Sequence, residues 1–212
     1  MSVSSEPPTP RPHLLVLDDA AVVRRALARR FGAAGLGSTT ASRNEEALTH
    51  LLKATKGEAR VDALVQDHER PVGGDGTRML KVMRGMYGDR TIANTGLTLR
   101  AVPVLVLSGE PHACEPALHK VDRSVRVLAK ATGPEALLLE LVNMWNGLKQ
   151  RILAATTEVG VHVVRTPHGW VVDAPSGVET ALFRGTGEQL ESTLTRLEEV
   201  CELAFPEANA AR

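Results

Sequence analysis

Residues 14–27 are LLVLDDAAVVRRAL, and this stretch predicts how most of the chain folds. Its first four residues are apolar and are followed by Asp18 and Asp19, a pattern typical of a buried parallel strand with polar residues at its carboxyl end. From Val23 onward, apolar residues recur at helical spacing and arginines occupy positions between them. The stretch therefore indicates a strand followed directly by a helix.

The same alternation continues along the first two-thirds of the chain. Apolar or β-branched runs predict strands, and the segments between most of them have the spacing of amphipathic helices. The predicted strands are 13–17, 37–42, 61–67, 102–110 and 124–130. Residues 88–100 show no clear period and are expected to form a loop. Five strands alternating with five helices predict an α/β fold with a doubly wound parallel sheet.

A different pattern begins after Gly160. Three short strand candidates, 161–167, 169–175 and 178–185, are separated by turn signals. The segment 187–205 then places apolar residues three and four positions apart on an acidic background, which predicts an amphipathic helix. This part of the chain is expected to form a small α+β module with a three-stranded antiparallel sheet and one helix.

The chain is expected to divide into five segments. The first twelve residues are polar and proline-rich, which predicts a disordered leader. Pro134 suits the first turn of a helix, and the apolar spacing that follows it continues past residue 150. The expected segments are a leader at 1–12, a main domain at 13–150, a continuation of the long helix at 151–158, the small module at 159–206 and a tail at 207–212.

Composition argues against several classes of protein. Lys and Arg together number 25, as do Asp and Glu, so no net field draws the whole chain to nucleic acid or to an anionic membrane. Residues 1–150 hold 20 basic and 16 acidic side chains, whereas residues 151–212 hold 5 and 9. The two cysteines are far apart, and no apolar run approaches the ~18 residues of a membrane span. We therefore expect a cytoplasmic protein.

Four of the predicted strands end in polar side chains, namely Asp18 with Asp19, Asp67, Ser108 and Lys130. The carboxyl ends of parallel strands face one crevice, so these groups should converge there. Close carboxylates raise one another's pKa, and Mg²⁺, which prefers oxygen ligands, would relieve the conflict. If Asp67 accepted a phosphoryl group, Lys130 could pair with one of its oxygens and Ser108 could donate to another.

In this order the motifs resemble the receiver domain of bacterial two-component response regulators. The matching stretches are LLVLDDAAVVRRAL, VDALVQDHERP, VPVLVLSGE and VLAK, which correspond to the first, third, fourth and fifth strands of that family. The resemblance covers residues 12–150 and includes Pro71, four residues after Asp67. It implies a flavodoxin-like five-stranded sheet.

The resemblance also implies a function and a site. Asp67 would accept a phosphoryl group from a sensor histidine kinase or phosphotransfer protein, with Ser108 as the switch hydroxyl and Lys130 as the paired cation. Mg²⁺ would be the cofactor, held by Asp18, Asp19, Asp67 and the backbone carbonyl of Glu69. A receiver of this kind phosphorylates itself and is not a turnover enzyme. It would signal to a downstream target by protein–protein contact, and the histidine kinase would meet the arginine-rich first helix.

The chain departs from the family pattern around this site. The loop after Asp67 is one residue longer than usual before its Asp-Gly pair, and Ala131 stands where the family commonly has proline. Val127 replaces a common aromatic residue. Glu69 and Glu110 each lie two residues past a site residue and could flank the phosphoryl group, where they would repel it or position water.

Simpler interpretations of the same residues stay open. Asp18 and Asp19 could be ordinary acids at the start of a helix, Ser108 could serve a turn, and Lys130 could be solvated. The protein could then be a phosphorylation-independent, receiver-like scaffold. A transcription regulator with an atypical DNA-binding module is a further alternative, although the acidic last helix is the opposite of what nucleic acid requires and makes nucleic-acid binding a poor prediction.

The long helix after Pro134 carries more apolar surface than a receiver sheet needs. We expect the surplus, centred on Trp145, Leu148 and Ile152, either to pack on the small module or to form a homodimer. Gly147 lies between the two halves of this helix and is its expected weak point.

Overall fold

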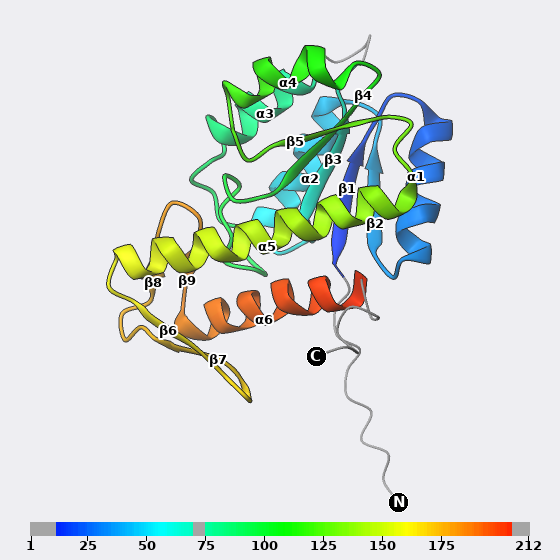
Figure 1. The fold of residues 1–212 in the computed structure, drawn as a ribbon. Helices are drawn as coiled ribbons and strands as arrows, with labels where there is room; N and C mark the ends of the chain where they lie inside the picture. The colour runs from blue at the N-terminus through cyan, green and yellow to red at the C-terminus, as the bar shows by residue number, and fades with distance from the viewer. Residues whose placement is uncertain (1–11, 70–74, 205–212) are drawn as a thin grey trace, which may run out of the picture.

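The computed structural model describes residues 12–69 and 75–204 of the chain (Figure 1). The expected leader up to residue 11, Pro71 and the expected tail at 207–212 lie outside the described residues. Among the described residues, no helix is both long and apolar enough to cross a membrane.

A five-stranded parallel sheet forms the centre of the molecule, as predicted. Its strands are β1 (His13–Leu17), β2 (Gly37–Ala41), β3 (Ala63–Asp67), β4 (Val104–Ser108) and β5 (Arg126–Ala129). They lie in the order β2-β1-β3-β4-β5, and every neighbouring pair is parallel. This order is the flavodoxin-like arrangement, in which ligands bind beyond the carboxyl ends of the strands near β1 and β3.

Helices cover both faces of the sheet because successive strand residues point to opposite sides. Leu14 and Val16 of β1 pack in one core with α1 (Ala21–Ala33) and α5 (Pro134–Glu158). Leu15 and Leu17 pack in the other core. That second core contains side chains of α2 (Asn44–Thr55), α3 (Gly76–Arg84) and α4 (Pro111–His119).

The small module contains four short strands and one helix. The elements are β6 (His162–Thr166), β7 (Gly169–Asp173), β8 (Val178–Glu179), β9 (Arg184–Gly185) and α6 (Gly187–Ala204). β6 pairs with β7 and β8 pairs with β9, both antiparallel, in two separate two-stranded sheets. Antiparallel strands and a final helix are therefore confirmed, whereas the expected single three-stranded sheet does not form.

The third strand candidate folds back on itself instead of pairing with β7. Thr180 closes a tight turn, because its amide donates to the Phe183 carbonyl at 2.8 Å and its hydroxyl accepts from the Phe183 amide at 3.0 Å. The fully buried Phe183 then forms a β-bridge with Leu97. Its ring fills the space where a Cβ on Gly96 would lie, and Gly96 has a φ of +65°. The β8–β9 hairpin is thus held by residues 96–98 of the larger domain rather than by the β6–β7 hairpin.

Residues 88–100, expected to be a loop, form the surface of the larger domain on which the β8–β9 hairpin and α6 pack. Thr98 donates its amide to Leu182 and its hydroxyl to Ala181, and the Thr193 hydroxyl of α6 donates to the Thr95 carbonyl. The segment contains no helix or named strand, as expected for a loop, and it packs against the module.

The surplus apolar surface of α5 is buried inside the chain. Trp145, Leu148 and Ile152 share one core with Leu190 and Leu194 of α6, which runs beside α5 (Figure 1). The apolar seam therefore packs on the module, one of the two outcomes expected for it. A homodimer would need a different surface.

Candidate functional site

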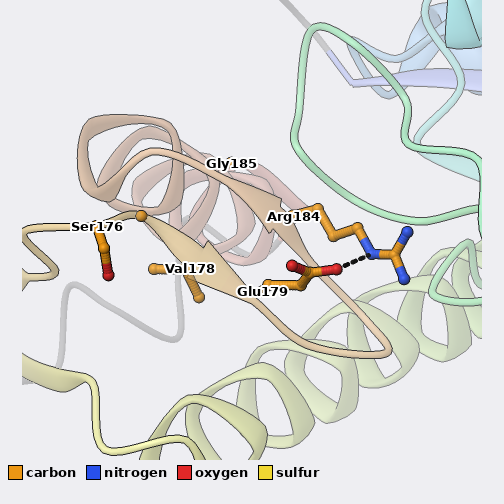
Figure 2. A pocket seen from close by; sticks show the side chains of 6 residues that line it. Ser176, Val178, Glu179, Arg184 and Gly185 are labelled. Atoms are coloured by element: carbon orange, nitrogen blue, oxygen red, sulfur yellow. Dashed lines mark ion pairs between the residues drawn. The ribbon is translucent and has the colours of Figure 1, made fainter.

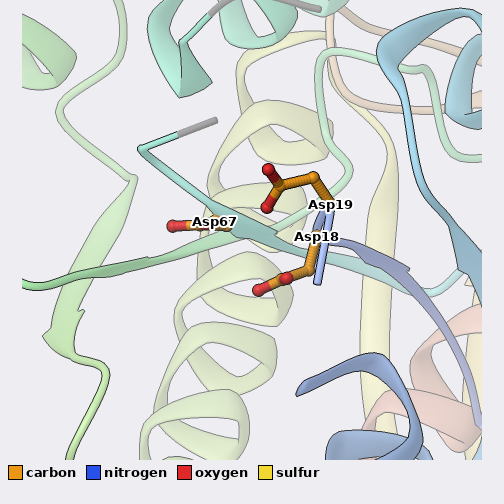
Figure 3. Close-up of side chains that lie close together, drawn as sticks. All are labelled: Asp18, Asp19 and Asp67. Atoms are coloured by element: carbon orange, nitrogen blue, oxygen red, sulfur yellow. The ribbon is translucent and has the colours of Figure 1, made fainter. Parts of the chain in front are cut away.

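Three carboxylates meet at the carboxyl end of the sheet (Figure 3). Asp18 and Asp19 follow β1, and Asp67 is the last residue of β3. One carboxylate oxygen of each lies within 4.8 Å of the others. Asp18 and Asp67 are each only 2% exposed, whereas Asp19 is exposed. The structure thus brings together the three acids that the sequence placed at two strand ends.

The turn between β1 and α1 holds this acidic pair in place. The Asp18 carboxylate accepts the Ala20 amide at 2.8 Å, so it also serves the local turn. Arg24 donates one guanidinium nitrogen to the carbonyls of Asp18 and Asp19, at 2.7 and 2.9 Å. The sequence marked Arg24 only as part of a basic helix face, because nothing local indicates that its side chain reaches back over its own turn.

Lys130 supplies the positive charge of the site. Its Nζ lies 2.8 Å from Asp67 Oδ1 and 3.7 Å from Glu69 Oε2. Partial burial alone would lower the pKa of Lys130, but the nearby carboxylates, above all Asp67, outweigh it and raise that pKa. The ammonium group therefore stays charged and orients the Asp67 carboxylate.

Ser108 and Glu69 form a second group of contacts at the same edge. The Ser108 hydroxyl donates to Glu69 Oε1 at 2.9 Å, and the Gly109 amide reaches the same oxygen at 3.2 Å. The Ser108 oxygen also accepts the Glu110 amide at 3.0 Å, so the expected turn role and the site role coexist. The hydrogen bond from Ser108, helped by Lys130, lowers the pKa of Glu69. Of the two flanking glutamates, Glu69 is the one whose carboxylate enters the contacts described here.

The charges of the site are unbalanced. Burial raises the pKa of Asp18, and the charges of Asp67 and Asp19 raise it further, against the opposing effects of the Ala20 amide and Lys130. Crowded carboxylate oxygens with a single ammonium nearby are the donor set that suits a hard divalent cation such as Mg²⁺. The residues present therefore fit the metal that the resemblance implies.

A cavity of about 210 Å³ opens between α1 and the site. Its walls combine apolar side chains of α1, including the exposed Val22 and the half-buried Ala26, with Asp18, Arg30 and Lys130. The Asp18 carboxylate and the Lys130 ammonium group therefore lie beside a partly apolar groove on the surface of α1.

A second hollow, of about 430 Å³, lies on the module (Figure 2). It is lined by the β8–β9 hairpin and the residues before it, with an ion pair of 3.3 Å between Glu179 and Arg184. The two charges neutralise each other, so the lining offers no group that distinguishes it as a reactive site.

Comparison with known proteins agrees with this geometry. No family model matches the chain, and no curated protein matches it. A protein from Chloroflexus aurantiacus assigned as a response regulator is 25% identical, with a TM-score of 0.51 over 64% of this chain and 98% of that one. Two further structures, both receiver domains, support the fold. One, from an HD domain-containing protein of Pseudomonas fluorescens, is 19% identical over 66% of this chain and 99% of that one, with a TM-score of 0.51. The other, a CheY-like protein of Methanospirillum hungatei, is 12% identical over 67% and 99%, with a TM-score of 0.53.

These findings define the class of the larger part of the molecule. The chain contains a receiver domain of the CheY-like kind, which covers about 64% of its length. The C-terminal region is an addition to that domain, and its own family is not defined by the comparisons.

Proposed function

We propose that this protein is a response regulator that accepts a phosphoryl group on Asp67 from a histidine kinase or phosphotransfer protein in the cytoplasm. The observation that carries the proposal is the placement of Asp67. Its carboxylate is buried, paired with Lys130 at 2.8 Å and within 4.8 Å of the Asp18 and Asp19 carboxylates. An activated carboxylate in such surroundings can act as a nucleophile toward phosphorus.

The chemistry follows from the positions of the chain's own groups. Lys130 holds Oδ1 of Asp67, and we assign attack on phosphorus to Oδ2. A new O–P bond forms as the N–P bond of a phosphohistidine breaks, and the departing imidazole nitrogen keeps the electron pair and takes a proton from water. Lys130 and the Ser108 hydroxyl would then pair with oxygens of the transferred group. Mg²⁺ held by Asp18, Asp19, Asp67 and the Glu69 backbone carbonyl would supply positive charge to those oxygens.

The kinase is expected to dock on α1. The cavity beside the site joins apolar residues of α1, such as Val22, to Lys130, and the arginines Arg25 and Arg29 are exposed on the same helix. A partner that covered this groove would exclude water from Asp67 while its histidine approached.

The module is proposed to signal by protein contact rather than by binding nucleic acid. Two acids of α6 serve the packing of the module itself. Glu191 accepts the Val172 amide at 2.7 Å, and Glu198 pairs with Arg165 at 2.9 Å and accepts from Trp170 at 3.2 Å. The acidic sequence of α6 would repel phosphates, which favours a protein target over nucleic acid. The complete set of site residues argues in turn against a scaffold that never cycles phosphate.

The test is phosphorylation of the full chain by acetyl phosphate, followed by mass spectrometry. We expect one phosphoryl group per chain, removed by hydroxylamine, dependent on Mg²⁺ and located on Asp67. Asp18→Asn, which keeps the size of the side chain but removes one anionic ligand, should raise the Mg²⁺ concentration needed for half-maximal labelling roughly ten-fold or more. No labelling, or labelling at another residue, contradicts the proposal.

A further inference from the structure

We infer that Glu69 is a positioning residue that competes with the phosphoryl group: its carboxylate holds the donors that an aspartyl phosphate on Asp67 would need, and it must leave them before the group can be accommodated. The inference rests on the proposed function. It concerns a residue that the family resemblance assigns only a backbone role.

The donors around Glu69 are those of an anion site. A hydroxyl from Ser108, a backbone amide from Gly109 and the ammonium group of Lys130 converge on one carboxylate, at 2.9, 3.2 and 3.7 Å. They come from the ends of β4 and β5, which lie side by side in the sheet. Charge-assisted hydrogen bonds of this kind are stronger than neutral ones, so the carboxylate is held by more than chance proximity.

One of these donors, Lys130, also contacts Asp67. Lys130 thus contacts both carboxylates, and the Glu69 amide donates to Asp67 Oδ1 at 3.1 Å. A phosphoryl group on Asp67 would carry its own negative oxygens into the space between Lys130 and Ser108. The Lys130 ammonium and the Ser108 hydroxyl cannot fully satisfy both the Glu69 carboxylate and the phosphoryl group. Because the two anions would lie side by side, they would also repel each other.

The Glu69 side chain is free to rotate away from Ser108 and Lys130. Its side chain is 48% exposed, whereas Asp67 beneath it is 2% exposed. Its backbone is tied to Asp67 by the amide hydrogen bond, so rotation about side-chain bonds can free the carboxylate while the main chain stays in place. A Cβ added at Gly109 would lie 3.2 Å from Glu69 Oε2, so the absence of a side chain there leaves room for the bound position.

Two consequences follow for the cycle. Before phosphorylation the Ser108 hydroxyl already donates a hydrogen bond to the Glu69 carboxylate, so it must exchange one anionic acceptor for another when the phosphoryl group arrives. After phosphorylation the displaced Glu69 carboxylate stays tethered nearby and competes for Lys130 and Ser108. Neutralising Glu69 should therefore favour every state in which a phosphoryl-like anion occupies the site.

The experiment measures binding of beryllofluoride, a non-covalent phosphoryl analogue, and the rate of phosphorylation by acetyl phosphate, both with Mg²⁺ and the full chain. The variants are Glu69→Gln, which keeps shape and loses charge, and Glu69→Ala, which removes the group. Glu58→Gln is the matched control, because it removes the same charge from an exposed side chain between α2 and β3, away from the carboxyl ends of the strands. Thermal melting confirms that each variant is folded.

We expect both Glu69 variants to bind beryllofluoride about ten-fold more tightly than the wild type and to label correspondingly faster, with little change in Glu58→Gln. Unchanged or weaker binding in the Glu69 variants overturns the inference while the proposed function stands. An equal gain in Glu58→Gln also overturns it, because the effect would then come from the net charge of the protein. If no protein, wild type included, takes up beryllofluoride or phosphate, the proposed function itself fails.

Discussion

Strand β3 has a buried aspartate at each end, and the two differ in almost everything except burial. Asp62 precedes the strand and faces two arginines, with its oxygens 2.7 Å from Arg60 Nε and 3.3 Å from Arg196 Nη2. Asp67 ends the strand and shares a single lysine with other carboxylates. The amino end has an excess of positive charge around one acid, and the carboxyl end has an excess of negative charge around one base.

The partners of the two aspartates also differ in exposure. Arg60 and Arg196 are 17% and 13% exposed, whereas Lys130 is 39% exposed. The longer Arg196 contact lacks the geometry of a hydrogen bond, and burial lowers the pKa of this guanidinium. A buried carboxylate therefore points to chemistry only when its neighbours leave charge unmatched and solvent can reach them. Asp67 meets both conditions, whereas Asp62 fails the second, because its arginine partners are largely shielded from solvent.

The largest expected effect comes from Asp67→Asn. An amide does not form an acyl phosphate, so labelling by acetyl phosphate should fall to background. Stability should be unchanged or higher, because the variant removes one of three crowded charges. Labelling measured beside a thermal melt tests both halves. Retained labelling would show that Asp67 is not the phosphoryl acceptor. A large loss of stability would show that Asp67, like Asp62, is needed for folding, and either result would contradict the contrast between the two ends of β3.

Asp62→Ala should show the opposite result. It leaves two buried guanidinium groups and the His13 amide without their common acceptor, at an expected cost of about 3–5 kcal/mol in the free energy of unfolding. Labelling of the folded fraction should persist. Urea denaturation gives the cost, and Asp173→Asn, at an exposed strand end, is the control with little expected change. Adding Arg196→Met should recover part of the loss if the unpaired charge is its cause.

A smaller gain is expected from Gly147→Ala. Gly147 is exposed within α5, and a Cβ there meets no atom within 4 Å. Alanine should stabilise the helix by about 0.5–1 kcal/mol.

Because α5 packs on both the sheet and the module, circular dichroism and the fluorescence of the buried Trp145, measured in a Trp170→Phe background, should report one shared transition. Two separate transitions would show that the module unfolds by itself.

The smallest expected effect is the pH dependence contributed by His13 at the amino end. Burial lowers the pKa of His13 against the opposing charge of Asp62, and its Nε2 lies 2.7 Å from the Thr39 hydroxyl. The unfolded chain then binds more protons than the folded one below the ordinary value of 6.5. Stability should therefore be lost as pH falls through that value toward the folded pKa. His13→Asn should flatten the fall in urea midpoints between neutral and mildly acidic buffers, and an unchanged slope would contradict this assignment.

The sequence predicted the carboxyl end of the sheet better than the amino end. Apolar runs that stop at Asp18, Asp67, Ser108 and Lys130 are local signals, and parallel topology makes local signals converge. Asp62 carries no such signal, because its partner Arg196 comes from the opposite end of the chain and looks like one more polar residue of an amphipathic helix. A pairing of that kind follows only from the packed structure.

The module shows the same limit. Residues 178–185 have a β-prone pattern, and the prediction of a third strand followed it. What overrode the pattern was the fit of Phe183 against Gly96, two residues that no sequence period connects. Glu69 is an intermediate case. Its position two residues past Asp67 indicated that it could flank the site, but its bond to Ser108 depends on how the ends of β3 and β4 meet.

The packing of α6 on α5 has a consequence for synthesis of the chain. Every strand of the receiver sheet and the whole of α5 are synthesised before α6, so Leu148 and Ile152 lack the cover of Leu190 and Leu194 until α6 has been translated. At ~5–20 residues per second this delay lasts on the order of seconds. For that interval the apolar residues of α5 that pack on α6 lack their cover. Premature termination after α5 would leave them without it permanently, and exposed apolar surface of this kind favours aggregation.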